Sequence, residues 1–141
     1  MGDIAERSFI YDRFHRDEFF SDEEADRVHR VWAEGSFDGR ADMVLVAELE
    51  DGQTVGYCTG IVCELDSVVG WVDMIAVHSE YRGYGIGRRL LKEICSYFYN
   101  RGVTRIALST QSTNSTAIRL YELFGFKHFG SARTYRSVLK V

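Results

Sequence analysis

The feature that most constrains this chain is a glycine-rich turn, Arg82-Gly83-Tyr84-Gly85-Ile86-Gly87, which lies between two apolar segments. Residues 68–77 before it are mostly apolar and predict a buried strand. Apolar side chains after it recur every three or four positions and predict a helix over 86–100. Glycines let the backbone turn tightly, and the free N–H groups that open a helix attract an anion. The sequence therefore predicts an anion site, for which the simplest ligand is a pyrophosphate.

Two well-known phosphate motifs do not match this turn. A P-loop ends in Gly-Lys-Ser/Thr, whereas here Gly87 precedes Arg88 and Arg89. A dinucleotide fingerprint has a different glycine spacing and needs an acidic residue on the next strand, and residues 103–108 contain none. A tight connection without any ligand stays open as an alternative. The arginines beside the turn, in a chain whose net charge is −4, favour the phosphate site.

The remaining pattern predicts a single α/β domain over residues 1–141. Beyond the two segments already named, we expect helices over 22–34 and 115–124 and strands over 43–50, 55–63, 103–109, 126–129 and 134–139. Ser21 and Glu24 form a capping box at the start of the first helix. Residues 1–20 are rich in aromatic side chains but contain no convincing strand.

Composition narrows the class of protein. A chain of 141 residues suits one compact domain, and its acidic balance argues against a general nucleic-acid or membrane-surface protein. Neither a signal peptide nor a membrane-spanning apolar run is recognisable in the sequence. Cys58, Cys63 and Cys95 lack metal-ligand spacing and are typical of thiols in a reducing compartment. We therefore expect a cytoplasmic protein without a metal, nucleic-acid or membrane partner.

The glycine turn resembles the Q/R-x-x-G-x-G/A motif of the GNAT superfamily, the acetyl-CoA-dependent N-acetyltransferases. The segment from Asn114 through Ala117 and Tyr121 to Phe126 resembles the second motif of that superfamily, N-x-x-A-x-x-x-Y-x-x-x-G-F. The resemblance covers about residues 43–138. It implies the GNAT fold, a central mixed twisted sheet flanked by helices, here with a shortened N-terminus. A missing first strand would expose the first hairpin, so we also expect a possible homodimer.

The resemblance implies acetyl-CoA as the cofactor and assigns its contacts. The strand before the turn would offer backbone groups to the pantetheine amides, as an added strand does at a sheet edge. The turn itself would bind the pyrophosphate. The expected cofactor-binding residues are Ile75, Ala76, Val77, Arg82, Gly83, Tyr84, Gly85, Ile86, Gly87, Arg88, Asn114, Ala117 and Tyr121. Arg82 has two possible roles, a structural one and a charge for the phosphates.

The resemblance also assigns Tyr121 as the acid that protonates the departing thiolate of coenzyme A. A phenol remains protonated at a pH where a thiol begins to ionise. The alternative is that Tyr121 is only a core aromatic. For a general base the candidate is Asp73, a carboxylate within an apolar strand. Asp73 could instead face solvent or pair with an arginine, and a water relay could replace a single base.

Residues 108–114, Leu-Ser-Thr-Gln-Ser-Thr-Asn, resemble the same segment of nucleotide-sugar amine acetyltransferases such as dTDP-fucosamine acetyltransferase. So does Tyr11-Asp12-Arg13-Phe14, followed by an acidic helix. This resemblance implies a small-molecule acceptor, the amino group of a nucleotide-linked sugar. A protein N-terminus, a polyamine or an antibiotic stays open as an acceptor. A module that binds acyl-CoA without catalysis is the alternative to an enzyme.

Overall fold

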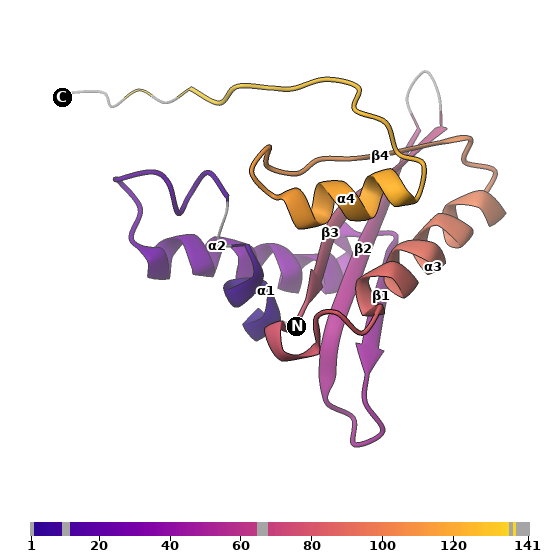
Figure 1. Ribbon diagram of the computed structural model, residues 1–141, viewed down its shortest axis with the longest axis horizontal. Coiled ribbons are helices and arrows are strands. Elements are labelled where there is room, and N and C mark those ends of the chain that lie inside the picture. Colours follow the sequence, from indigo (N-terminus) through magenta and orange to yellow (C-terminus); the bar gives the residue numbers. More distant parts are fainter. Residues whose placement is uncertain (1, 10–11, 65–67, 136, 138–141) are drawn as a thin grey trace.

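The computed structural model describes the whole chain except residues 1, 10–11, 65–67, 136 and 138–141. The described residues form a four-stranded sheet with helices packed against it (Figure 1). The helices are α1 (Gly2–Ser8), α2 (Asp22–Gly35), α3 (Ile86–Asn100) and α4 (Ser115–Leu123), with the short turns η1 (Ser36–Arg40) and η2 (Ser79–Tyr81). The strands are β1 (Met43–Glu48), β2 (Thr54–Glu64), β3 (Val68–Val77) and β4 (Arg105–Leu108). Within this described part, every helix is too short or too polar to cross a membrane.

The sheet is mixed, with the strand order β1-β2-β3-β4. Strands β1, β2 and β3 are antiparallel, whereas β4 is parallel to β3, and α3 makes the crossover between them. Helices α1 and α2 pack on one face over a core that includes Ile4, Ala33 and Met74. Helices α3 and α4 pack on the other face over a core that includes Leu91 and Tyr121. The predicted mixed sheet between helices is therefore confirmed.

Strand β3 has one residue more than its partner β2 near the middle of the sheet. Thr59 pairs with Met74 and Gly60 pairs with Val72, so Asp73 lies between the two pairs as a β-bulge. The Thr59 hydroxyl accepts a 3.1 Å hydrogen bond from the Met74 N–H, which fixes the bulge. Pairing of β3 with β4 stops at Val72. Beyond the bulge, β3 therefore continues beside β2 alone.

The bulge also changes which face of the sheet the side chains of β3 cover. Val72 packs in the core beneath α3, whereas Met74, two positions later, packs in the core beneath α1 and α2. Ile75 and Val77 then pack on the α3 face. Alternate residues of a regular strand stay on one face, so the extra residue is what reverses the pattern.

Helix α3 lies close to the sheet because glycines stand beneath it. A Cβ built on Gly70 would lie 2.7 Å from Phe98 Cγ, and one built on Gly60 would lie 2.7 Å from Phe98 Cζ. Phe98 itself is fully buried. A Cβ built on Gly56 would lie 3.3 Å from Leu90 Cδ1. The side chains of α3 therefore rest on the main chain of β2 and β3.

Most elements expected between residues 22 and 124 form with small shifts at their ends. The strand expected over 103–109 is shorter, because regular pairing with β3 covers only Arg105–Leu108. Ser21 and Glu24 make the predicted capping box. No described residue before β1 is in a strand, as expected, although the sequence did not predict helix α1. Strand β1 thus lies at an edge of the sheet, and the homodimer stays a prediction.

The two strands expected near the C-terminus are wrong as far as the structure describes them. Residues 126–135 are irregular, and part of the expected strand 134–139 lies outside the described residues. In Figure 1 this segment leaves the sheet after α4. Phe126 packs on Tyr121, with ring centroids 6.1 Å apart, but Phe129 is fully exposed. One partly buried aromatic side chain does not give a pair of strands the apolar face that it needs.

The contact between α3 and the sheet gives a stability prediction. Gly70→Ala should lower the free energy of unfolding by about 1–3 kcal/mol, because the added methyl group overlaps the Phe98 ring in a packed core. Urea denaturation measures the change. Gly130→Ala is the control, since no described atom lies within 4 Å of a Cβ at that position. Equal stability of the two variants would contradict the close approach of α3 to β3.

Candidate active site

The glycine turn leaves the N-terminus of α3 open. Gly83 and Gly85 have φ angles of +86° and +78°, a region that favours glycine. No described atom lies within 4 Å of a Cβ built on either residue. Gly85 is the N-cap of α3 and has no side chain with which to cap it. The first N–H groups of the helix can therefore meet a ligand, with the positive end of the helix dipole behind them.

The residues expected to bind the cofactor at this turn reach the surface together. Gly83, Tyr84, Gly85 and Arg88 are exposed, and Ile86 and Gly87 are half-buried. Arg82 donates from Nε to the Val77 carbonyl oxygen at 3.0 Å. This bond ties the turn to the end of β3, so the structural role left open for Arg82 is observed.

One edge of β3 has no neighbouring strand beyond the bulge, among the residues that the structure describes. The N–H groups of Met74 and His78 both point to β2, with hydrogen bonds of 3.1 and 2.9 Å to it. Peptide groups alternate in direction along such a strand, so those of Ile75 and Val77 point to the open edge. The side chain of Ala76 is buried beneath α1 and α2. The structure thus brings Ile75 and Val77 to the open edge but not Ala76.

The glycine turn, the open edge of β3 and helix α4 meet at Gly87. A Cβ built there would lie 3.7 Å from Val77 Cγ2 on β3 and 3.7 Å from Leu120 Cδ2 on α4. A strand edge can pair with the amides of an extended ligand, and a helix N-terminus can bind an anion. The arrangement therefore suits an elongated ligand with an anionic end.

Helix α4 carries the second expected group of site residues. The Asn114 Oδ1 accepts a 3.2 Å hydrogen bond from the Ala117 N–H, so its predicted role as N-cap is confirmed. Tyr121 is 8% exposed and belongs to the core beneath α3. Burial, together with the nearby Cys58 thiol, raises the pKa of Tyr121 to about 12. The phenol is thus protonated at neutral pH, which a proton donor requires and which a core aromatic also satisfies.

Asp73, the expected base, is the bulge residue itself. Its carboxylate lies 2.7 Å from Arg40 Nη2, and its side chain is 20% exposed. Arg40 comes from η1 and also donates to the Trp32 carbonyl oxygen at 3.1 Å. The alternative of an arginine partner is therefore confirmed, and the ion pair links η1 to the bulge. A role for Asp73 as general base stays a prediction.

Sequence reasoning missed two groups near this region. The first is Arg16, whose Nη2 donates to Thr113 Oγ1 at 2.9 Å, just before α4. These residues are 97 positions apart, so no local pattern could reveal the contact. The second is a cluster of Asp12, His15 and His29 beside α2. Its only local signal was an aspartate three positions before a histidine, among aromatic residues.

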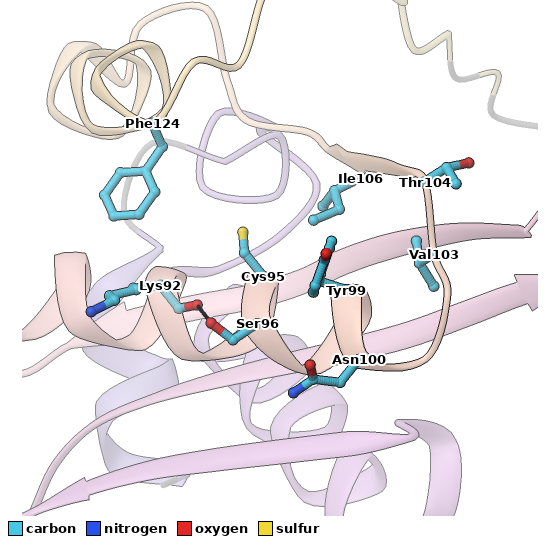
Figure 2. Close-up of a pocket in the computed structure, with 9 residues that line it drawn as sticks. All are labelled: Lys92, Cys95, Ser96, Tyr99, Asn100, Val103, Thr104, Ile106 and Phe124. Carbon is cyan, nitrogen blue, oxygen red and sulfur yellow. Dashed lines mark hydrogen bonds between the residues drawn. The ribbon is translucent and has the colours of Figure 1, made fainter.

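A separate hollow of about 620 Å³ lies between α3, β4 and α4 (Figure 2). Its lining residues are Lys92, Cys95, Ser96, Tyr99, Asn100, Val103, Thr104, Ile106 and Phe124. None of them is an expected cofactor-binding or catalytic residue. Burial raises the pKa of the Cys95 thiol, which keeps the thiol protonated and weakly nucleophilic at neutral pH. The expected site residues therefore lie outside this hollow.

The fold and the site define a protein that holds an extended, anionic ligand between a helix N-terminus and a sheet edge. The chain belongs to the acetyltransferase (GNAT) family, whose pattern matches residues 7–126. The predicted family and fold class are thereby confirmed, and acetyl-CoA is the cofactor that members of this family use.

Similar curated proteins include the spore coat polysaccharide biosynthesis protein SpsD of Bacillus subtilis and N-alpha-acetyltransferase 30 of Schizosaccharomyces pombe. The first is 28% identical over 124 residues, which cover 88% of this chain but only 42% of the relative. The second is 31% identical over 117 residues, covering 79% of this chain and 68% of the relative. A solved protein of Pyrococcus furiosus, described as an acetyl transferase, has a TM-score of 0.72 and 24% identity, over 90% of this chain and 84% of that one. It shares the fold.

The residues present fit coenzyme A. The open space at Gly83 and Gly85 admits a pyrophosphate, and the exposed Arg88 supplies positive charge beside it. The backbone groups of Ile75 and the N–H of Val77 can pair with the amides of the pantetheine arm, whereas the Val77 carbonyl oxygen already accepts from Arg82 Nε. The open turn and the strand edge together are therefore compatible with coenzyme A.

The open turn gives a binding prediction. Gly85→Asp should weaken coenzyme A binding roughly 100-fold or more, because a carboxylate would stand where the pyrophosphate meets the helix. Calorimetric titration measures the affinity. Gly52→Asp is the matched control, since Gly52 has a φ of +84° and equally open surroundings but lies in the β1–β2 turn. Wild-type affinity in the Gly85 variant would contradict this placement of the pyrophosphate, and equal losses in both variants would assign the effect to backbone strain.

Proposed function

We propose that this chain transfers the acetyl group of acetyl-CoA to a primary amine by direct attack of that amine. The observation that carries the proposal is the meeting of the α3 N-terminus, the open edge of β3 and α4 at Gly87. The open edge runs from Val77 back to the bulge at Asp73. A ligand anchored at α3 and paired with this edge extends toward the bulge.

Bound acetyl-CoA supplies an acetyl thioester. The acceptor nitrogen forms the new C–N bond as the C–S bond breaks, and the departing sulfur then needs a proton. We assign that proton to Tyr121 Oη, because burial keeps the phenol protonated with a pKa of about 12. The same rise in pKa makes the phenol a weaker acid. We therefore expect its rate enhancement to lie at the lower end of the range for general acid catalysis. Asp73 or a water relay removes the proton of the amine.

For the acceptor we propose an amino group on a nucleotide-linked sugar. A hollow of about 610 Å³ is lined by Arg13, Phe14, Arg16, Asp17, Glu18, Phe20, Thr134 and Tyr135. Arginines suit a diphosphate, and aromatic rings suit a stacked base. Of the segment that resembles nucleotide-sugar enzymes, Tyr11 lies outside the described residues. The likeness to a polysaccharide biosynthesis protein also supports a sugar acceptor.

The charges in this hollow weigh against other small amines. Its lining has two arginines, Arg13 and Arg16, and two acidic residues, Asp17 and Glu18. A polyamine or an aminoglycoside is strongly cationic and favours an acidic groove. A protein N-terminus is the second candidate acceptor, because the chain is 31% identical to N-alpha-acetyltransferase 30 over 79% of its length.

The acid role of Tyr121 gives a kinetic prediction. Tyr121→Phe should lower kcat by about 10²–10⁴, toward the lower end, because the ring remains but the donated proton is lost. Coenzyme A affinity should change little, since its main anchors are backbone groups elsewhere. Because the pKa of Tyr121 is about 12, the wild-type enzyme should show no alkaline loss of activity from this group below that pH. Thiol release measures the rate.

Tyr99→Phe is the matched control, because Tyr99 is 79% exposed and lies in the hollow of Figure 2. Wild-type turnover in Tyr121→Phe, with damage only in Tyr121→Ala, would leave Tyr121 a packing residue.

The acceptor is tested by thiol release from acetyl-CoA with a nucleotide amino sugar, the free amino sugar, a peptide with a free N-terminus and a polyamine. The nucleotide amino sugar should give the highest kcat/KM. Arg16→Ala should raise KM for it roughly tenfold and leave the free amino sugar unaffected, because only the former carries a diphosphate. A highest rate with the peptide would favour the second candidate. Binding of acetyl-CoA without thiol release on any amine would favour a non-catalytic module.

A further inference from the structure

A cluster of imidazole and carboxylate groups lies beside α2, on the face of the sheet opposite α3. Asp12 and His15 come from the segment after α1, and His29 comes from α2. One ligand atom of each residue lies within 4.8 Å of the others. Asp12 is 3% exposed and His29 is 4% exposed, so the cluster is nearly closed to solvent. Polar and charged groups buried this deeply require partners.

Hydrogen bonds within the cluster leave it incompletely satisfied. Asp12 Oδ1 lies 3.1 Å from His15 Nδ1, and Asp12 Oδ2 is the partner of His29 Nε2. His29 Nδ1 is buried without a hydrogen-bond partner among the described residues. A neutral imidazole has one donor and one acceptor nitrogen. A divalent cation can replace the proton that His29 Nε2 and Asp12 Oδ2 share, and the imidazole proton is then on Nδ1.

His15 has the outer partner that a metal-binding histidine commonly has. Its Nδ1 faces Asp12, while its Nε2 lies 3.0 Å from Asp26 Oδ1. A carboxylate on the second ring nitrogen fixes the orientation of a ligating imidazole and raises its basicity. The Asp26 side chain is 37% exposed, so it marks the side from which an ion can enter.

Aromatic rings close the other side of the cluster. The ring centroids of Phe9, Phe14 and Trp32 lie 4.6, 6.1 and 5.5 Å from that of His29. An apolar wall of this kind excludes water and strengthens electrostatic interactions within the cluster.

We propose that Asp12, His15 and His29 bind one divalent transition-metal ion of the zinc class. Two imidazole nitrogens and one carboxylate oxygen, with a fourth position left over, are a ligand set typical of zinc. Calcium and magnesium prefer sets of oxygen ligands. The sequence predicted no metal, because its three cysteines lack ligand spacing.

The ion cross-links the segment after α1 to helix α2. That segment also carries Arg16, which reaches Thr113 just before α4. The metal would therefore fix the segment that lines the proposed acceptor hollow.

The experiment measures metal binding by the untagged chain after chelation and dialysis, with Zn²⁺ and Co²⁺ as probes. The wild-type chain should bind about one Zn²⁺, gain thermal stability with it, and give the visible absorption of four-coordinate Co²⁺. His15→Ala and Asp12→Asn should each weaken Zn²⁺ binding about 100-fold or more. Because the readout is metal content, its result is independent of acetyl transfer.

His128→Ala and Cys63→Ser are the controls, since both residues are exposed and lie outside the cluster. Both variants should bind Zn²⁺ as the wild-type chain does. If Asp12→Asn fails to fold, His15→Ala decides, because its side chain is 11% exposed and less central. Absence of Zn²⁺ binding by the folded wild-type chain, or unchanged affinity in His15→Ala, would overturn the proposal and leave a proton-sharing network.

Discussion

The single extra residue in β3 is the constraint on which the rest of the structure depends. The bulge at Asp73 sends Val72 to one core and Met74 to the other, so one strand supports helices on both faces. It also coincides with the end of pairing to β4. Without it, β3 and β4 could pair further, and the peptide groups of Ile75 and Val77 would be occupied. The open edge of β3 is therefore a product of strand register.

Signals carried by neighbouring residues were enough to predict most elements and the turn that opens α3. The capping box at Ser21 and the glycine turn before α3 are local, and both form as expected. The bulge could not be predicted, because β3 is apolar on both faces and has no alternation that an inserted residue would interrupt. The partner of Asp73, Arg40, is 33 positions away, so sequence reasoning could only leave an arginine open as an alternative.

The prediction of two C-terminal strands was wrong for a related reason. A strand is defined by its partner as much as by its own composition. Phe126 finds a place against Tyr121, yet the described residues after it have no ladder to join. The N-terminal segment shows the opposite case. Its aromatic residues predicted no strand. In the structure, Phe9 and Phe14 pack around His29, which lies beside Asp12 and His15.

The glycines beneath α3 have a consequence for how the two halves of the cofactor site are related. Because the Phe98 side chain rests on Gly60 and Gly70, the glycines of β2 and β3 let the helix lie close to the sheet. Gly56 does the same at the other end of α3, where a Cβ would lie 3.3 Å from Ile86 Cγ2, so the helix N-terminus also lies close to the sheet. The N-terminus of α3 and the open edge of β3 are therefore already in place before a ligand binds. A ligand long enough to contact both features binds a preorganised site, so little binding free energy is lost to reorganisation of the protein.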